Sequence, residues 1–430
     1  MNLEAWLQKI AQQHPQQIEL GLDRIAQVAQ AMGFVRSAQG FSLGTVAIVV
    51  GGTNGKGSTC AMLESILLAA GFRVATYTSP HLIRFNERLR LNGQPASDDQ
   101  FVSAFERVES AQKRIQQGVS LTYFEFTTLA AFDLIRKEQP DVAILEVGLG
   151  GRLDAVNLID SDCAVLTSVD LDHQAFLGGT REAIGWEKAH IARAGKPFIC
   201  ADPMPPQTVL DVVEQIGADL WRIGEDFNFQ GDRQQWSWAG RGQRRNAMAY
   251  PALRGVNQLL NASAALAALA SVRDRIPVTQ GDVRQGLALV ELAGRFQVLP
   301  GQPAVVLDVA HNPHAAGVLA ANLDQMGFFP NTYAVVGMLA DKDARAVFDR
   351  LKDRIDAWYL ADLKGEDLVG REQTAESLKG QLFDVIPQAQ AQCFSGPVEA
   401  FQAAKGAAEP NDRIIVFGSF FTVASVINNR

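Results

Sequence analysis

One short stretch has the residue types and spacing of a phosphate-binding loop. Residues 51–59 read Gly-Gly-Thr-Asn-Gly-Lys-Gly-Ser-Thr and directly follow the apolar run 45–50. Glycines let successive backbone N–H groups turn into one concavity, where a lysine can reach the β- and γ-phosphates. The spacing departs from GxxxxGK[ST] because Gly57 separates Lys56 from Ser58. The alternative is a glycine-rich turn with a surface lysine, but a preceding buried strand and a following helix favour phosphate binding.

The elements that must position this loop alternate between strands and helices. The run 45–50 reads as a buried strand, 58–71 as a helix that ends at a glycine, and 72–79 as the next strand. This order is the βαβ unit of a parallel sheet. Further strands are expected at 141–148, 163–169 and 196–201, and further helices at 3–13, 22–32, 98–117, 126–139, 181–195, 208–218 and 257–272. The polar, aromatic-containing stretch 225–250 predicts a small antiparallel excursion.

A second α/β pattern follows the turn-like segment 294–303. It comprises expected strands at 304–310, 333–339, 357–363 and 413–419, with helices at 314–326, 342–353, 373–381 and 397–406. The pattern predicts two α/β domains with parallel sheets, 1–293 and 294–430. No short internal repeat is visible.

Composition excludes several classes of protein. The chain has 430 residues, 47% of them hydrophobic, and 39 basic against 47 acidic residues leave a net charge of −8. Such a surface argues against binding long polyanions by bulk charge, so we expect no nucleic-acid and no membrane partner. The N-terminus lacks a secretory signal, and no apolar stretch approaches the ~20 residues that span a bilayer. The four cysteines form no CxxC pair and suit a reducing compartment, so we expect a cytoplasmic protein: Cys60, Cys163, Cys200 and Cys393.

Several blocks in the same order resemble the Mur ligase superfamily, and within it the folylpolyglutamate synthases. GTNGKGS at 52–58 resembles their ATP loop. Further matching blocks are 77–93, 145–157, 168–173, 185–197, 294–297, 308–315 and 417–423. The resemblance implies a P-loop ATPase-like domain followed by a smaller Rossmann-like domain. It also implies an ATP-dependent ligase that joins an acid to an amino acid.

Three side chains at or after predicted strand ends are candidates for a magnesium site. Ser79, Glu146 and His173 follow strands near the loop, where ligands collect in open α/β sheets. The resemblance implies that they hold Mg²⁺, and it leaves room for a monovalent cation such as K⁺. An imidazole is unusual for so hard an ion, so the assignment of His173 rests on the resemblance. The alternatives are a helix-capping carboxylate for Glu146 and a hydrogen-bonded loop histidine for His173.

The resemblance also implies that Lys188 is carbamylated, which turns a cation into a carboxylate-like group near the metal. The reaction needs a neutral amine, and hence a pKa lowered by burial or by nearby cations. The alternative is a solvated surface lysine. Lys56, Lys188 and His173 are the residues expected to serve catalysis.

Nucleotide contacts are expected from both domains by resemblance. Asn261 would meet the base, Arg295 the phosphates, and Asp308 the ribose or the incoming amino acid. Alternatives are a linker salt bridge for Arg295 and a helix cap for Asp308. His311 is expected to contact substrate, and Ser419 glutamate. The expected loop contacts are Thr53, Asn54, Gly55, Lys56, Gly57 and Ser58.

Two segments, 17–24 and 121–125, resemble bifunctional bacterial members of the family and thereby suggest the acid substrate. Phe124 can stack on a flat pterin, and Glu125 can pair with ring N–H groups. The alternative for Phe124 is a core aromatic. The candidate substrate residues are Thr122, Tyr123, Phe124, Glu125, Leu153, Asp154 and Ala155.

The resemblance thus implies ligation of L-glutamate to dihydropteroate and to the γ-carboxylate of reduced folates, through an acyl phosphate, by a monomer. A Mur-type ligase of UDP-sugars is disfavoured because only 44 residues precede the first strand of the P-loop domain. A non-catalytic nucleotide switch is disfavoured because such a protein does not need a carboxylate-activating site. The candidate magnesium ligands and Lys188 would form such a site.

Overall fold

The computed structural model describes residues 1–16, 18–115, 118–232, 234–365, 368 and 370–429. Parts of the predictions at 17–24, 98–117, 225–250 and 294–430 therefore lie outside the described residues. The chain divides into two compact units. The first comprises Met1–Ala252 and Leu259–Val290, and the second comprises Leu253–Gln258 and Glu291–Arg430.

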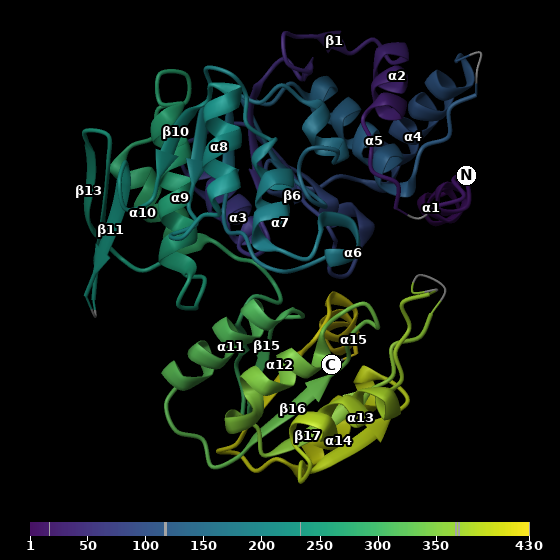
Figure 1. Cartoon of the computed structure of the whole chain (residues 1–430), viewed down its shortest axis with the longest axis vertical. Coiled ribbons are helices and arrows are strands. Elements are labelled where there is room, and N and C mark those ends of the chain that lie inside the picture. Colours follow the sequence, from purple (N-terminus) through teal and green to yellow (C-terminus); the bar gives the residue numbers. More distant parts are fainter. Residues whose placement is uncertain (17, 116–117, 233, 366–367, 369, 430) are drawn as a thin grey trace. The chain divides into compact units, whose positions relative to one another are not determined.

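The first unit is built on an eight-stranded sheet with the order β10-β9-β8-β3-β7-β4-β5-β6 (Figure 1). From β10 to β4 neighbouring strands are parallel, and β5 and β6 are antiparallel additions. The strands are β3 Val46–Gly51, β4 Val74–Tyr77, β5 Leu89–Leu91, β6 Gln94–Pro95, β7 Val142–Glu146, β8 Cys163–Leu166, β9 Pro197–Cys200 and β10 Asp219–Arg222. Every residue of β3, β7 and β8 is buried, as expected of strands covered on both faces.

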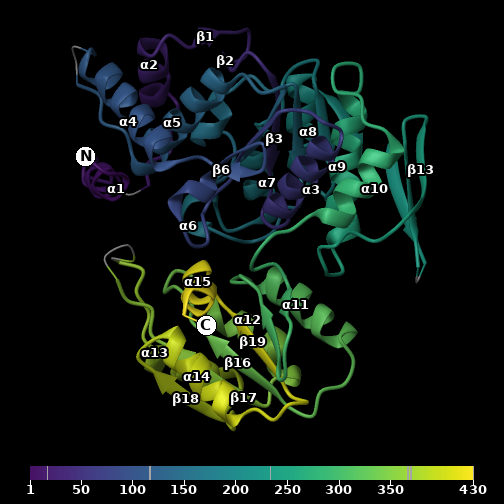
Figure 2. The ribbon, with the colours of Figure 1, turned by 180° about the vertical axis from the view of Figure 1, so that it is seen from behind.

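Helices cover both faces of this sheet (Figures 1 and 2). Alternate residues of β3, Ala47 and Val49, share one core with Ile184 and Val209 of α7 (Arg181–Ala189) and α8 (Gln207–Ile216). The other face carries α3 (Lys56–Ala69), α9 (Gln258–Ser271) and α10 (Gln280–Leu289). A Cβ at Gly286 of α10 would lie 2.4 Å from Cα of Ile66, so glycine permits α3 and α10 to pack closely.

Smaller elements complete the first unit. Helices α1, α2, α4 and α5 share the core on the α7 face. Strands β11–β13 form the antiparallel excursion that the sequence predicts. The bounds are α1 Leu3–Ala11, α2 Asp23–Ala31, β1 Val35–Arg36, β2 Phe41–Ser42, η1 Phe85–Arg88, α4 Asp98–Lys113, α5 Tyr123–Glu138, η2 Ala155–Leu158, α6 Gln174–Leu177, β11 Phe227–Gly231, β12 Trp236–Gly240 and β13 Gln243–Met248.

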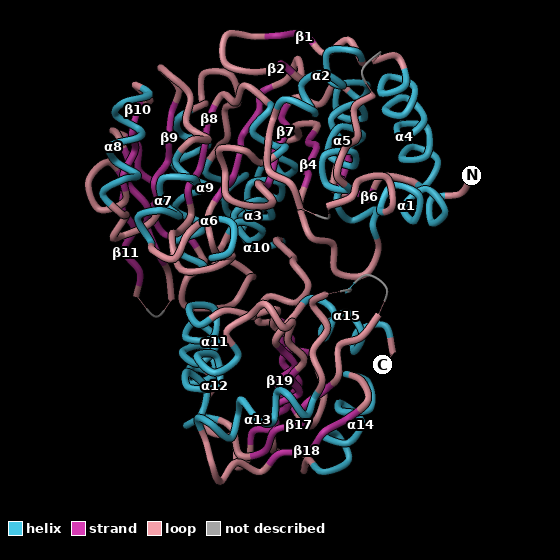
Figure 3. Tube along the Cα trace, turned by 45° about the vertical axis from the view of Figure 1, so that its right-hand side comes forward, coloured by secondary structure: helices cyan, strands magenta, loops and turns pink. Residues whose placement is uncertain are grey.

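The second unit (Figure 3) has a six-stranded sheet in the order β14-β15-β19-β16-β17-β18. Only β14 is antiparallel to its neighbour within these described strands. The elements are β14 Gln297–Leu299, β15 Ala304–Leu307, α11 Pro313–Gln325, β16 Thr332–Val336, α12 Ala344–Leu351, η3 Lys352–Arg354, β17 Ala357–Ala361, α13 Ala375–Val385, β18 Ala391–Phe394, α14 Pro397–Ala407, β19 Arg413–Phe417 and α15 Phe420–Asn428.

Several elements differ from the sequence-based expectation. Helix α5 begins at Tyr123 and not at 126, because Thr122 and Glu125 form a capping box ahead of the apolar run. Helices α10 and α15 and strands β10 and β18 are not anticipated by the sequence patterns. Leu253–Gln258 belong to the second unit, where the side chain of Asn322 accepts a hydrogen bond of 2.8 Å from the Val256 N–H. None of the helices in the described part of the chain is long and apolar enough to cross a membrane.

Candidate functional site

The nucleotide loop joins β3 to α3 and requires glycine at two positions. Gly52 and Gly55 have φ values of 143° and 88°, a region that other residues rarely adopt. A Cβ at Gly52 would lie 1.9 Å from Oγ1 of Thr167, and one at Gly55 would lie 2.5 Å from Oδ1 of Asn261. The predicted nucleotide residue Asn261 therefore lies directly against the loop.

A polar segment after β8 holds this loop in shape. The Thr53 N–H donates to the Ser168 carbonyl at 2.8 Å, and the Asn54 N–H donates to Oγ of Ser168 at 3.1 Å. Oγ1 of Thr167 donates to the Asn54 carbonyl at 2.7 Å, and the Asp170 N–H donates to Oγ1 of Thr53 at 3.0 Å. The first-turn N–H groups of α3 face the end of the loop and are suited to bind a phosphate.

Sequence reasoning missed the role of residues 167–170. The sequence pattern that could have indicated this role is the group of polar residues Thr167, Ser168 and Asp170 at the end of the predicted strand 163–169. They also overlap the matching block 168–173.

Two lysines meet at one carbonyl of the loop. Nζ of Lys56 donates to the carbonyls of Gly52 at 3.0 Å and Thr53 at 3.3 Å, and Nζ of Lys188 donates to the Gly52 carbonyl at 3.0 Å. Lys188 is only 5% exposed.

The Lys188 amine has the lowered pKa that carbamylation requires. Burial and then the charge of Lys56 lower the pKa of Lys188 to about 7, against the opposing effects of Asp172 and Asp154. The responsible cation is thus Lys56, on another element, and the solvated-lysine alternative does not hold for so buried a side chain.

Two of the three candidate magnesium ligands lie together at neighbouring strand ends. Glu146 closes β7, is 5% exposed, and accepts a hydrogen bond of 3.2 Å from the backbone N–H of Ser79, just beyond β4. The third candidate, His173, belongs to the segment that follows β8. It is the N-cap residue of α6, has a φ of 49°, and lies with Nε2 3.9 Å from Oδ1 of Asp172.

The donor chemistry of this set fits Mg²⁺ in one particular way. A buried carboxylate and a hydroxyl are hard oxygen donors. Among the described residues, no group of three or more His, Cys, Asp or Glu side chains could hold a metal by itself. Mg²⁺ is usually bound by one or two protein carboxylates together with water and substrate phosphates. Glu146 and Ser79 therefore offer donor types that such a site uses.

Phe124 lies in the first turn of α5, whose start is held by a capping box. The Glu125 N–H donates to Oγ1 of Thr122 at 3.2 Å, and the Thr122 N–H donates to Oε2 of Glu125 at 2.8 Å. The other oxygen of Glu125 lies 3.1 Å from Nη2 of Arg24. Glu125 therefore has a structural role at this helix start, while the Tyr123 ring packs edge-on to Phe85 with centroids 6.4 Å apart.

Phe124 and Asp154 border the same tight turn. A Cβ at Gly148 would lie 2.5 Å from Cζ of Phe124 and 3.1 Å from Oδ2 of Asp154. Asp154 accepts hydrogen bonds from the N–H groups of Leu149 at 2.7 Å and Val156 at 2.9 Å. Burial raises the pKa of Asp154 to about 6. Phe124 is half-buried, so part of its ring remains accessible, whereas Ala155, the first residue of η2, is buried.

The neighbouring candidate Leu153 contacts the N-terminal segment. Its carbonyl accepts a hydrogen bond of 3.3 Å from the Gly21 N–H.

In the second unit, candidate residues gather around Phe420. The guanidinium of Arg295 lies 5.0 Å from the centroid of the Phe420 ring, and the His311 ring lies 6.4 Å from it. Asp308 accepts hydrogen bonds of 2.8 Å from the N–H groups of Phe296 and Ala310. Burial raises the pKa of Asp308, although the charge of Arg295 opposes this.

Ser419 caps the helix that carries Phe420. It accepts a hydrogen bond of 3.0 Å from the Thr422 N–H at the start of α15. Sequence reasoning missed Phe420, although it lies in the matching block 417–423.

Comparison with known proteins shows which family this chain resembles along its length. Residues 50–269 match the Mur ligase middle domain, and residues 294–420 match the Mur ligase glutamate ligase domain. The chain is 41% identical to the dihydrofolate synthase/folylpolyglutamate synthase of Escherichia coli, over 99% of this chain and 94% of that protein.

Two solved structures extend the likeness to the fold. E. coli FolC in complex with DHPP and ADP has a TM-score of 0.92 at 40% identity, covering 100% of this chain and 97% of that one. A bifunctional folylpolyglutamate synthase/dihydrofolate synthase with Mn, AMPPNP and L-glutamate has a TM-score of 0.88 at 42% identity, covering 100% and 98%. The expected fold is confirmed, and the chain belongs to the Mur ligase family, within its group of dihydrofolate synthase/folylpolyglutamate synthases.

Proposed function

We propose that this chain is an ATP-dependent ligase that joins L-glutamate to dihydropteroate, forming dihydrofolate, and to the γ-carboxylate of folates. The observation that carries the proposal is full-length similarity to enzymes named for these two activities. Lys56 and Lys188 both donate to one carbonyl of the nucleotide loop, as described above, and this contact is consistent with that similarity.

The reaction has two steps in which the chain supplies charge and position. A substrate carboxylate oxygen attacks the γ-phosphorus of ATP, ADP leaves, and an acyl phosphate forms. The α-amine of glutamate then attacks the acyl carbon, expels phosphate and loses a proton. Lys56 would exchange its carbonyl acceptors for phosphate oxygens, and the N-terminus of α3 would donate to the same group. Binding places the reacting groups together and excludes water.

Ser79, Glu146 and His173 are the residues that would hold Mg²⁺. The bound ion supplies positive charge that screens the phosphates. Lys188 would act as its carbamate, formed when the neutral amine attacks CO₂ and loses a proton. The conversion replaces repulsion between the buried ammonium group of Lys188 and the half-buried ammonium group of Lys56 by attraction between the carbamate and Lys56.

The remaining candidates divide between the substrates. Phe124 and Asp154 would receive the pterin, together with their neighbours Thr122, Tyr123, Glu125, Leu153 and Ala155. Asn261, Arg295 and Asp308 would meet the nucleotide, and His311 and Ser419 the incoming glutamate. Domain 1–293 would thus bind ATP and folate, and domain 294–430 would contribute glutamate and nucleotide contacts. We expect a monomer in the cytoplasm.

One assay tests this proposal. Purified protein with ATP, Mg²⁺ and glutamate is offered dihydropteroate, tetrahydrofolate or a UDP-muramoyl acid, and ADP release and product mass are followed. We expect one glutamyl addition to dihydropteroate and successive additions to tetrahydrofolate. Turnover of the UDP-muramoyl acid alone, or of none of the three acids, would refute the proposal.

A further inference from the structure

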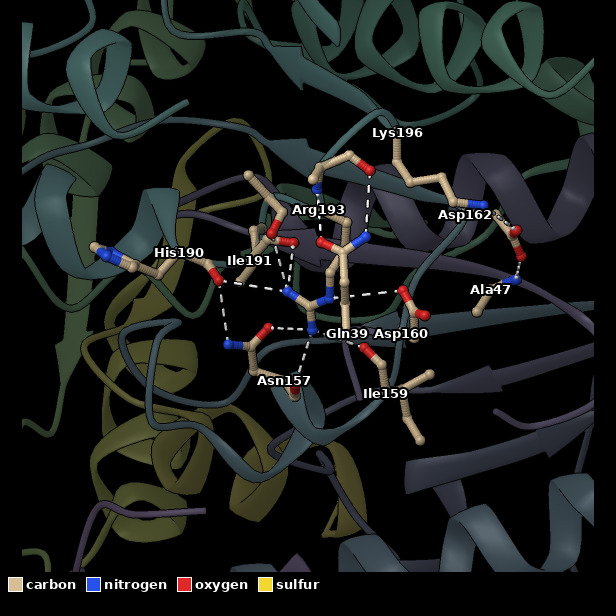
Figure 4. Close-up of polar contacts among 12 residues, drawn as sticks. Gln39, Ala47, Asn157, Ile159, Asp160, Asp162, His190, Ile191, Arg193 and Lys196 are labelled. Atoms are coloured by element: carbon tan, nitrogen blue, oxygen red, sulfur yellow. Dashed lines mark hydrogen bonds and ion pairs between the residues drawn. The ribbon is translucent and has the colours of Figure 1, made fainter. Parts of the chain in front are cut away.

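Arg193 is a buried arginine that binds two separate segments of backbone. It lies just beyond α7 and is 6% exposed. Its Nη2 donates to the carbonyls of Asn157 and Ile159, each at 2.8 Å, and its Nη1 donates to those of Ile191 at 3.2 Å and Ala192 at 3.1 Å (Figure 4). The guanidinium therefore cross-links the segment 151–160 to the segment after α7.

Other hydrogen bonds strengthen the same cross-link. Nδ2 of Asn157 donates to the Arg152 carbonyl at 3.0 Å. It also donates to the His190 carbonyl at 3.2 Å, and Oδ1 of Asn157 accepts from Arg193 at 2.8 Å (Figure 4). The Arg152 N–H donates to the Glu187 carbonyl at 2.9 Å. Segments 151–160 and 187–193 are thus joined at several points along their length.

These two segments carry residues of the candidate site. The first contains Asp154 and the second contains Lys188. A Cβ at Gly151 would lie 3.0 Å from Cα of Lys188, so the segments are in tight contact beside the lysine. A Cβ at Gly51, where the nucleotide loop begins, would lie 2.9 Å from Cδ1 of Ile191. Ile191, just beyond α7, therefore packs against the start of the loop whose Gly52 carbonyl accepts from Lys188.

We propose that Arg193 is a positioning residue for the ligase reaction, holding Lys188 and Asp154 in place relative to the nucleotide loop. The role of Arg193 in catalysis rests on the proposed function, whereas its role in holding Lys188 and Asp154 in place does not. Arginine suits this task because its planar guanidinium presents five donors in a fixed fork. A lysine would keep the charge but could not satisfy acceptors on both segments at once.

The test compares Arg193→Met and Arg193→Lys with the control Lys196→Met. Lys196 lies three residues further along the chain, its side chain is 42% exposed, and it pairs with Asp162 at 3.4 Å. Two quantities are measured below the melting temperature of each variant. One is kcat and KM for glutamate ligation. The other is the pH midpoint of cyanate labelling at Lys188 in the nucleotide-free protein, read by peptide mass.

We expect Arg193→Met to lower kcat about 100-fold, because a misplacement of about 1 Å can cost that much. The labelling midpoint should rise above 7 as water enters around Lys188, whose charged neighbours are Lys56, Asp172 and Asp154. Arg193→Lys should lie between this variant and the unsubstituted protein. Lys196→Met should change neither quantity more than about twofold, because its 3.4 Å ion pair joins neither segment that Arg193 cross-links and its side chain is 42% exposed.

Unchanged kcat and an unchanged Lys188 midpoint in folded Arg193→Met would overturn the proposal. If that variant does not fold, Asn157→Ala weakens the same cross-link, and an unchanged midpoint there would overturn it equally. If the unsubstituted protein ligates no glutamate, the proposed function fails, while the labelling experiment still decides whether Arg193 positions Lys188.

Discussion

The lowered pKa of Lys188 makes the stability of the protein depend on pH in a defined direction. The folded-state pKa is about 7, against an ordinary value of 10.5, and a tenfold change in acidity corresponds to about 1.4 kcal/mol. Between these values the unfolded chain binds the proton and the folded chain does not. The free energy of unfolding therefore rises with pH across this window, and the penalty is fully present below pH 7.

Lys188→Met removes the titrating amine while keeping a long side chain. Because the variant carries no such penalty, its advantage over the unsubstituted protein should shrink by about 2 kcal/mol between pH 7 and pH 9. Urea unfolding of both proteins in CO₂-free buffer at several pH values measures this difference. Lys137→Met, at an exposed lysine of α5, is the matched control and should show a constant offset. A constant offset for Lys188→Met as well would refute the assigned burial and charge repulsion.

Three further predictions concern the same unit. In bicarbonate buffer, intact mass should show one added CO₂ that is absent in Lys188→Met; full activity with unmodified Lys188 would contradict the proposed carbamate. Gly55→Ala should abolish ATP binding in calorimetry, because its Cβ would meet Asn261 at 2.5 Å and its φ is 88°, whereas Gly317→Ala, with open space around it, should not. The Asp154 pKa of about 6, raised from 3.8, predicts that the free energy of unfolding falls by about 2 kcal/mol as the pH rises between those values. Asp154→Asn should remove this fall, and an equal fall in both proteins would count against the raised pKa.

Much of the nucleotide site could be predicted because its signals are local. A continuous apolar run predicts a buried strand, and glycines followed by helical periodicity predict a turn and a helix at 58–71, which the structure shows as α3 from Lys56 to Ala69. The ends of parallel strands meet at one edge of a sheet, which brought Ser79 and Glu146 together as expected. Helices α10 and α15 escaped prediction because one is polar with two glycines and the other is a short apolar run without clear periodicity.

The sequence by itself determined the order of elements, the nucleotide loop and the family resemblance, because periodicity, glycine and block order are properties of neighbouring residues. Only the tertiary structure decided that Lys188 is a buried lysine with a lowered pKa. Its contact with Gly52 spans 136 positions in the chain, and its lowered pKa comes from burial and from Lys56 on a different helix. The cross-link through Arg193 is equally long-range, since it joins segments more than 30 residues apart. Such effects depend on desolvation and packing in three dimensions, which local sequence patterns do not encode.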